Sequence, residues 1–338
     1  MIPAGVFKQS ISRFLQPIES LLTDDSISEI MINGPDEIWV EKKGMLYPTN
    51  VRFPTLQALD AALNNISQYC GRQWDHYNPI LETHLPDGSR LEAVMAPIAK
   101  NGPTVAIRRF YKSKLRVADL IDNNTITEEA AVYLANAIAK KKNVVVSGGT
   151  GSGKTSLLCA LSAFFVKRER IVVIEDTHEL DIQQKHVVYL ESRSADENGK
   201  GEIRIRDLLK ATLRLRPDRI LIGEVRGDEA LDLVQAMTSG HAGSMTTVHA
   251  NTPADALRRF ETMILSSQST IPHQAICAQI ASAIDVVIQI NRGHTGKRSI
   301  CDISTVSSTL RDGNYLVEPI FRREFDGPLK RITPEVSR

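Results

Sequence analysis

A glycine-rich segment in the middle of the chain has the spacing of a phosphate-binding loop. The apolar run Val144–Val146 leads into Gly-x-x-x-x-Gly-Lys-Thr, which ends at Thr155. Glycines let backbone N–H groups turn inward around a polyphosphate, Lys154 can reach its β and γ oxygens, and the Thr155 hydroxyl can ligate Mg²⁺. A helix from Thr155 onward would point its positive N-terminus at the same anion. The candidate nucleotide-binding residues are Gly148, Gly149, Thr150, Gly151, Ser152, Gly153, Lys154, Thr155 and Ser156.

Three further strands rich in β-branched residues are each followed by a polar side chain. These side chains are Glu175, Glu224 and His249. Because parallel strands share a carboxyl edge, we expect all three to lie beside the phosphate-binding loop. A carboxylate there can hold Mg²⁺ through water or accept a proton from the water that attacks ATP. A second histidine, His241, precedes the strand that His249 follows, and a γ-phosphate switch would explain this pair.

Each of these residues also has a simpler explanation. Glu175 or Asp176 could cap the next helix, Glu224 could pair with Arg226 at the surface, and His249 could be a hydrogen-bonded strand-end histidine. The loop could be a glycine-rich turn with an exposed, solvated lysine. The legible strand and helix around it, and the order of the three polar strand ends after it, favour the catalytic interpretation.

The composition indicates an ordinary water-soluble protein of two domains. The chain has 338 residues, 42% hydrophobic and 24% charged, and a net charge of +1 that demands neither nucleic acid nor an anionic membrane. We find no secretory signal and no apolar stretch near the ~20 residues that a bilayer requires. Four cysteines without a C-x-x-C pair argue against a zinc ribbon or a disulfide framework, and indicate reduced thiols in the cytoplasm.

The pattern of elements predicts a small α+β domain over residues 1–110, a polar linker at 111–126 and a second domain over 127–338. In the first we expect a mixed sheet, with strands near 27–32, 37–40, 45–47, 90–95 and 105–110 and a helix over 55–69. In the second, Thr127 caps a helix, and strands and helices then alternate to Ile290, which predicts a largely parallel sheet flanked by helices. Residues 192–202 read as a flexible polar loop.

Several segments together resemble the secretion-superfamily ATPases, the hexameric motors of type II and type IV secretion and of pilus assembly. IVVIEDTHEL resembles their acidic box, LRLRPDRILIGEVRGDEALDLVQAMTSGH the Walker B region, and GHAGSMTTVHANTPADALRRFE the histidine box. DDSISEIMINGPDEIWVE, HLPDGSRLEAVMAPI and TVAIRRF resemble the preceding domain, especially in the tight-adherence (Tad/Flp) pilus branch. The tetracysteine zinc module of some branches is absent. The resemblance implies a RecA-like P-loop motor domain after a smaller α+β N-terminal domain.

The resemblance also implies roles for single residues in the motor domain. Lys154 and Thr155 would bind phosphate and Mg²⁺, and Glu224 would polarise the lytic water. Glu175 would assist from the acidic box and contribute to the metal site. The implied cofactors are ATP and Mg²⁺.

Four further roles follow from the same resemblance. His241 and His249 would sense the γ-phosphate. Arg90 and Arg108 match arginines of the N-terminal domain that reach the nucleotide. Because neighbouring strand residues face opposite ways, only one of Arg108 and Arg109 can point to the site, and the family pattern favours Arg108.

These features predict a cytoplasmic ATP-hydrolysing ring motor that powers pilus assembly or protein secretion. The resemblance implies a homo-hexamer that docks on an inner-membrane platform protein, with peripheral membrane association at the inner face of the cytoplasmic membrane and no nucleic-acid partner. One alternative is a P-loop kinase of a small molecule, although no lid insertion is visible. Another is a nucleic-acid translocase, although the near-neutral chain contains only 5% aromatic residues. A scaffold would leave the carboxylates without a purpose.

Overall fold

A computed structural model describes residues 11, 13–109, 115–193, 195, 199–267, 270–293, 295–324 and 327–332. The chain divides into two compact units, Met1–Tyr111 with Ala195–Gly201, and Lys112–Ser194 with Glu202–Arg338. None of the helices within the described ranges is long and apolar enough to cross a membrane.

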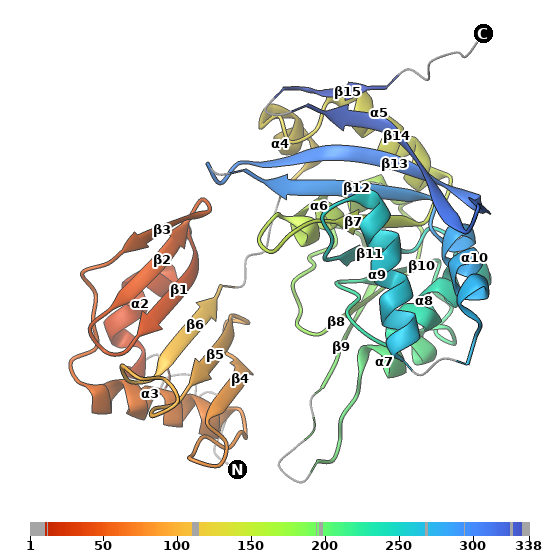
Figure 1. The fold of residues 1–338 in the computed structure, drawn as a ribbon. Coiled ribbons are helices and arrows are strands. Elements are labelled where there is room, and N and C mark those ends of the chain that lie inside the picture. The colour runs from red at the N-terminus through yellow and green to blue at the C-terminus, as the bar shows by residue number, and fades with distance from the viewer. Residues whose placement is uncertain are drawn as a thin grey trace. The chain divides into compact units, whose positions relative to one another are not determined.

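The N-terminal unit is built on one antiparallel sheet whose strand order is β3-β2-β1-β6-β5-β4 (Figure 1). All neighbouring strands run antiparallel, so the expected mixed sheet was wrong. The sequence pattern also missed β4, which follows Asn78 and Pro79 directly. The elements are η1 (Gln16–Ile18), α2 (Glu19–Thr23), β1 (Ile27–Asn33), β2 (Ile38–Lys42), β3 (Met45–Pro48), α3 (Leu56–Tyr69), β4 (Ile80–His84), β5 (Arg90–Val94) and β6 (Thr104–Arg108).

Alternation along the strands gives this sheet one buried and one more exposed face. In β6, Val105 and Ile107 are buried while Thr104 and Arg108 are exposed. The buried face packs against the apolar side of α3, which begins after Thr55, where the Thr55 hydroxyl accepts a hydrogen bond from the Ala58 N–H. Arg90 on β5 and Arg108 on β6 are therefore positioned by the strands of this sheet.

The second unit contains a nine-stranded sheet of order β15-β14-β13-β12-β7-β11-β10-β8-β9. The strands from β12 to β9 in this order pair in parallel, as expected, and β13 to β15 add an antiparallel edge that the sequence pattern did not indicate. The elements are α4 (Val117–Asp122), α5 (Glu128–Ala139), β7 (Val144–Ser147), α6 (Lys154–Leu161), η2 (Ser162–Phe164), β8 (Ile171–Glu175), β9 (Val187–Glu191), α7 (Ile205–Thr212), β10 (Arg219–Ile222), α8 (Glu229–Thr238), β11 (Met245–Val248), α9 (Pro253–Ser266), α10 (His273–Ala283), β12 (Val286–Arg292), β13 (Arg298–Arg311), β14 (Asn314–Arg323) and β15 (Leu329–Arg331).

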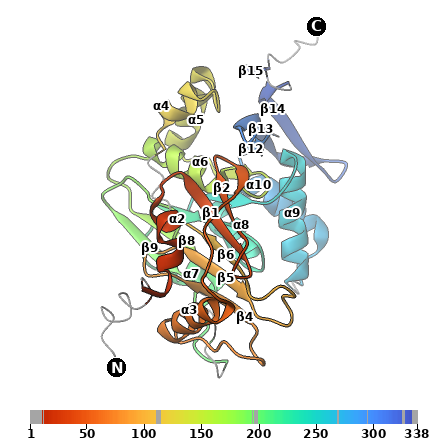
Figure 2. The same cartoon turned by 90° about the vertical axis from the view of Figure 1, so that its left-hand side faces the viewer.

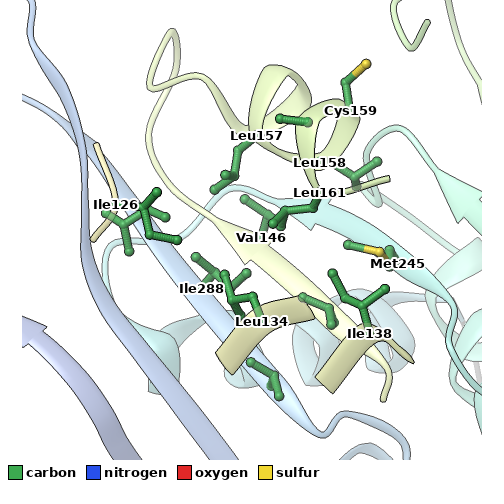
Figure 3. Close-up of a cluster of buried hydrophobic side chains, with 14 of the residues drawn as sticks. Ile126, Leu134, Ile138, Val146, Leu157, Leu158, Cys159, Leu161, Met245 and Ile288 are labelled. Carbon is green, nitrogen blue, oxygen red and sulfur yellow. The ribbon is translucent and has the colours of Figure 1, made fainter. Parts of the chain in front are cut away.

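Helices cover both faces of this sheet, which explains why its central strands are buried along their whole length and consist mostly of apolar residues. Helices α4, α5 and α6 pack on the face that includes Val144 and Val146, and α7 to α10 pack on the face that includes Val145. Figure 2 shows α9 and α10 beside each other within this unit. In Figure 3, Leu157, Leu158 and Leu161 of α6 point toward the sheet, so the helix that follows the phosphate-binding loop is fixed by the core.

The predicted linker 111–126 is mostly part of the second unit. Its residues 111–114 lie outside the described residues, but residues 117–122 form α4, and Leu120 and Ile126 are buried in the core. The short helix escaped prediction because two turns do not establish a helical period. Helix α5 starts after Thr127 as expected, but the Thr127 hydroxyl makes no capping hydrogen bond.

Candidate active site

The phosphate-binding loop connects β7 to α6 at the carboxyl edge of the parallel strands. Gly153 caps α6 with φ +94°, a left-handed conformation that favours glycine. Gly148 is restricted by packing, because a Cβ there would lie 2.3 Å from the Ile290 carbonyl oxygen and 2.6 Å from the Ser152 hydroxyl. A Cβ at Gly149 would meet nothing within 4 Å. The loop therefore packs tightly at its first glycine and is open at its second.

Lys154 is more enclosed than the sequence suggested. The residue is 7% exposed, and its Nζ donates to the carbonyl oxygens of Gly148 at 3.2 Å and Gly149 at 3.1 Å. The same Nζ lies 3.3 Å from both ring nitrogens of His249. The ammonium group is thus anchored inside the loop, so the alternative of a glycine-rich turn with an exposed, solvated lysine is not supported.

Glu224 and His249 meet next to this lysine, because β10 and β11 are parallel neighbours that end at the same edge. The distance from His249 Nε2 to Glu224 Oε1 is 2.8 Å, and the Arg226 guanidinium donates to Glu224 Oε2 at 2.8 Å. Arg226 also lies 3.5 Å from the Asp176 carboxylate. Both the catalytic prediction for Glu224 and its surface alternative, an ion pair with Arg226, therefore find support in the contacts.

Burial lowers the pKa of His249, and the Lys154 ammonium lowers it further, while the Glu224 carboxylate opposes both effects. The imidazole is therefore neutral at pH 7. Nε2 lies 2.8 Å from Glu224 Oε1 and 3.3 Å from Lys154 Nζ, but within the described residues Oε1 has no hydrogen-bond partner, so the contact with Glu224 is one of proximity. His249 thus contacts both the cation of the loop and the carboxylate that follows β10.

Glu175 ends β8 in the interior and has backbone partners of its own. Its carboxylate accepts hydrogen bonds from the N–H groups of Glu179 at 3.1 Å and Leu180 at 3.0 Å. Desolvation raises its pKa to about 8 despite these hydrogen bonds. Gly223 packs directly on it, since a Cβ at 223 would lie 2.9 Å from Glu175 Cγ. These contacts describe a carboxyl group that shapes the turn after β8, and its roles in metal binding and catalysis remain predictions.

The structure does not bring His241 to the phosphate-binding loop within one chain. His241 precedes β11, whose first residue, Met245, pairs with the first residue of β7. The loop follows the last residue of β7, at the other edge of the sheet. His241 is instead held at the amino edge, where its carbonyl oxygen accepts a hydrogen bond from the Ser244 hydroxyl at 2.7 Å. Contact of His241 with a γ-phosphate in its own chain is therefore not supported.

The three arginines considered in the sequence analysis, Arg90, Arg108 and Arg109, have distinct surroundings within the N-terminal unit. Arg90 and Arg108 are opposite each other on β5 and β6, so their side chains share the more exposed face of the sheet. Arg90 pairs with Glu82 on β4. Arg109 has an 11% exposed side chain and donates to the Asp24 carbonyl oxygen. The predicted division between Arg108 and Arg109 agrees with these contacts, while delivery of Arg90 or Arg108 to a nucleotide remains a prediction.

Two arginines that the sequence analysis did not select lie against the loop. Arg298 Nε donates to the Gly151 carbonyl oxygen at 3.1 Å, and a Cβ at Gly151 would lie 2.9 Å from Arg292 Nη1. The two residues pair across β12 and β13. Their signal in the sequence is the basic cluster NRGHTGKR directly after the last apolar strand. They add positive charge where polyphosphate is expected.

The comparisons with known proteins agree with this arrangement. The family described as "Type II/IV secretion system protein" matches residues 13–311. The chain belongs to this family.

Relatives of this secretion-family protein include the conjugal transfer protein TrbB of Rhizobium radiobacter, 33% identical over 82% of this chain and 83% of the relative. Another is the type IV secretion system protein PtlH of Bordetella pertussis, 31% identical over 87% of this chain and 94% of the relative. Neither belongs by name to the tight-adherence branch, which stays a prediction.

Solved structures share the fold of the chain. The ATPase DotB of Legionella pneumophila has a TM-score of 0.59 at 20% identity and covers 88% of this chain and 80% of its own. The pilus retraction motor PilT with bound ADP has a TM-score of 0.57 at 17% identity, with coverages of 91% and 82%. The expected α/β fold, a RecA-like motor domain after a smaller α+β domain, is confirmed.

The residues of the loop in this secretion-family protein fit the ligands that the sequence implies. Within the described part of the chain, the Ser152 hydroxyl is buried and has no hydrogen-bond partner. The first backbone N–H groups of α6 lie at its N-terminus, next to the Lys154 ammonium. Thr155 is the second residue of α6, the usual position of a hydroxyl that ligates Mg²⁺ in such loops. A cavity of about 320 Å³ opens beside Glu224 and is lined by Asp176, Arg193, Arg204, Glu224, Arg226 and Asp228, among other residues.

Proposed function

We propose that this secretion-family protein is a Mg²⁺-dependent ATPase that works as a homo-hexameric ring in the cytoplasm and pushes on an inner-membrane platform protein. ATP hydrolysis in a secretion or pilus-assembly apparatus is the activity that the family and the fold support. The ring, the metal, the membrane partner and the tight-adherence branch are the finer parts of the proposal.

One observation carries the assignment of chemistry. His249 Nε2 lies 3.3 Å from the Lys154 ammonium and 2.8 Å from the Glu224 carboxylate. The candidate phosphate-binding cation and the candidate base therefore both contact the same histidine side chain. This spacing is what hydrolysis of a bound polyphosphate requires, because the attacking water must lie between the base and the terminal phosphate.

The residues then divide the work as follows. Lys154, the loop N–H groups and the N-terminus of α6 hold and neutralise phosphate oxygens. Glu224 orients water and accepts its proton, and the Arg226 guanidinium directs that carboxylate through a hydrogen bond to Oε2. His249 lies between Lys154 and Glu224 and fixes their spacing. The Thr155 hydroxyl would hold Mg²⁺, which would supply charge neutralisation on the phosphates.

Glu224→Gln tests the proposed base. The amide keeps the shape of the side chain but cannot accept a proton, so we expect nucleotide affinity near that of the wild type and phosphate release lower by about 100-fold or more. Phosphate release without any acceptor substrate in the wild type also separates an ATPase from a small-molecule kinase. Equal loss of binding and turnover in Glu224→Gln would contradict the assignment.

Asp176→Asn is the matched control, because Asp176 also faces the Arg226 guanidinium. If turnover depends only on a partner for Arg226, the two variants will behave alike. Lys154→Ala adds a test of the loop, and we expect it to lower turnover by at least about 100-fold through lost charge stabilisation. Lys185→Ala, which removes an exposed lysine, should leave turnover unchanged.

A further inference from the structure

Three side chains with metal-ligating atoms lie together between α9 and α10. They are Glu261 on α9 and, on α10, His273 and Cys277. The distance from His273 Nε2 to Glu261 Oε2 is 3.2 Å, and that from the same Nε2 to Cys277 Sγ is 3.4 Å. All three ligand atoms lie within 4.8 Å of one another. None of these residues belongs to the nucleotide site.

The helices hold these residues in place for simple geometric reasons. His273 begins α10 and Cys277 follows one turn later, so both project from the same helix face. Helix α9 packs against α10 and directs Glu261 to that face. The thiol is at the buried end, with Cys277 4% exposed, and the imidazole is at the rim, with 58% of the His273 side chain exposed. An ion could therefore enter from solvent and meet a fixed sulfur atom.

The distances agree with the edges of a tetrahedral zinc site. With Zn–N, Zn–O and Zn–S lengths of about 2.0–2.3 Å, the N–O edge is about 3.4 Å and the N–S edge about 3.6 Å. The distances here, 3.2 Å and 3.4 Å, are within about 0.2 Å of those values. The donor set also selects the metal, since a thiolate and an imidazole suit Zn²⁺ whereas Mg²⁺ and Ca²⁺ prefer oxygen ligands alone.

Tyr315 on β14 is an independent feature at the same place. Its hydroxyl is buried and makes no hydrogen bond of normal geometry within the described part of the chain. The side chains of Glu261 and Cys277 adjoin this hydroxyl. A protonated phenol can donate to a ligating carboxylate and orient it, which is the usual role of an outer-shell partner.

We propose that Glu261, His273 and Cys277 form a Zn²⁺ site that fastens α9 to α10, with water in the fourth position. On binding, the Cys277 thiol releases its proton to solvent and the thiolate becomes a ligand. The ion links two helices that the chain connects through residues 267–272, so it stabilises the outer face of the second unit.

Titration of the metal-stripped full-length protein with Co²⁺ tests the site. A cysteine-ligated tetrahedral Co²⁺ gives a thiolate-to-metal charge-transfer band and intense visible bands, and we expect both to saturate at one Co²⁺ per chain and to disappear on addition of Zn²⁺. Zn²⁺ should also raise the midpoint of thermal unfolding, because it binds the folded state.

Cys277→Ser and His273→Ala should each weaken metal binding by about 100-fold or more and abolish the thermal shift. His273 is exposed at the start of its helix, so its variant remains informative if Cys277→Ser fails to fold. Cys301→Ser, which removes a partly buried thiol on β13, is the matched control and should keep the band. A wild type without the band, or a band that survives Cys277→Ser, would overturn the proposal.

Discussion

The buried carboxyl group of Glu175 makes the stability of the protein depend on pH. Its carboxyl group is 4% exposed, and burial raises its pKa from 4.5 to about 8. Between about pH 4.5 and pH 8, Glu175 therefore keeps its proton in the folded protein but has lost it in the unfolded chain. Stability from this group is complete below about pH 4.5 and is lost as the pH rises through about 8.

Glu175→Gln should remove this dependence, because an amide cannot ionise. Relative to the wild type, we expect the variant to gain stability between pH 5 and pH 8.5 by an amount on the order of a few kcal/mol. Urea unfolding across this range measures the effect. Glu318→Gln removes an exposed carboxylate on β14 that does not influence Glu175 and should leave the slope unchanged. A parallel pH profile for wild type and Glu175→Gln would show that Glu175 ionises normally.

At the scale of elements, the amino edge of the sheet is fixed by a buried ion pair. Arg219 begins β10 with 0% exposure, and its Nε donates to Glu169 at 2.6 Å. The same guanidinium donates to the carbonyl oxygens of Ile138 at 2.8 Å and Gly243 at 3.2 Å. It lies 4.7 Å from the centre of the Phe165 ring. One side chain thus joins the end of α5 to the starts of β10 and β11.

Removing one partner of this pair leaves a buried charge without compensation. Arg219→Ala and Glu169→Ala should each destabilise the second unit by about 3–5 kcal/mol, and the double variant by less than the sum. A double-mutant cycle in urea unfolding measures the coupling. Lys141→Ala, whose exposed ammonium lies 3.6 Å from Glu169, should cost less than about 1 kcal/mol. Strict additivity of the two single changes would refute the coupling.

Some of these elements could be predicted from the sequence and others could not. Uninterrupted apolar runs such as 144–146 and 220–222 indicate buried parallel strands, so the central sheet and its carboxyl edge were predictable. Strand β13 is rich in serine and threonine and shows no apolar alternation, and only its pairing with β12 defines it. Arg298 is far from Gly151 along the chain, so local patterns could not reveal that contact. The position of His241 before its strand did indicate the opposite edge, but the family motif suggested otherwise.

At the scale of the whole molecule, the second unit begins earlier than the predicted boundary at residue 127. Leu120 and Ile126 belong to its core, and the Thr125 carbonyl oxygen accepts a hydrogen bond from Ile300 on β13 at 3.0 Å. A fragment 112–338 should therefore fold. The fragment 127–338 lacks the core side chains of Leu120 and Ile126, so its free energy of unfolding should be lower by about 3–6 kcal/mol. Thermal and urea unfolding compare the fragments. Equal stability would show that α4 is dispensable.

The contribution of the N-terminal unit to turnover is tested with its two adjacent arginines. Arg108 is exposed, so Arg108→Ala should leave thermal unfolding unchanged and lower turnover by about 10-fold or more if its guanidinium reaches phosphate. Arg109 is bound within its own unit, so Arg109→Ala should lower the unfolding midpoint and leave turnover per folded molecule intact. The opposite pattern, with Arg109→Ala alone reducing turnover, would reject the assignment.

The packing around the loop glycines also has a consequence for evolution. Position 148 has a carbonyl oxygen 2.3 Å from where a Cβ would stand, whereas position 149 has open space. Neither glycine has a left-handed backbone conformation, so the two positions differ only in the space available for a side chain. In a library that samples every amino acid, position 148 should accept glycine only, and position 149 should accept alanine and serine. Substitutions that accumulate in evolution should therefore be more frequent at position 149 than at position 148, although the two are adjacent in the same motif.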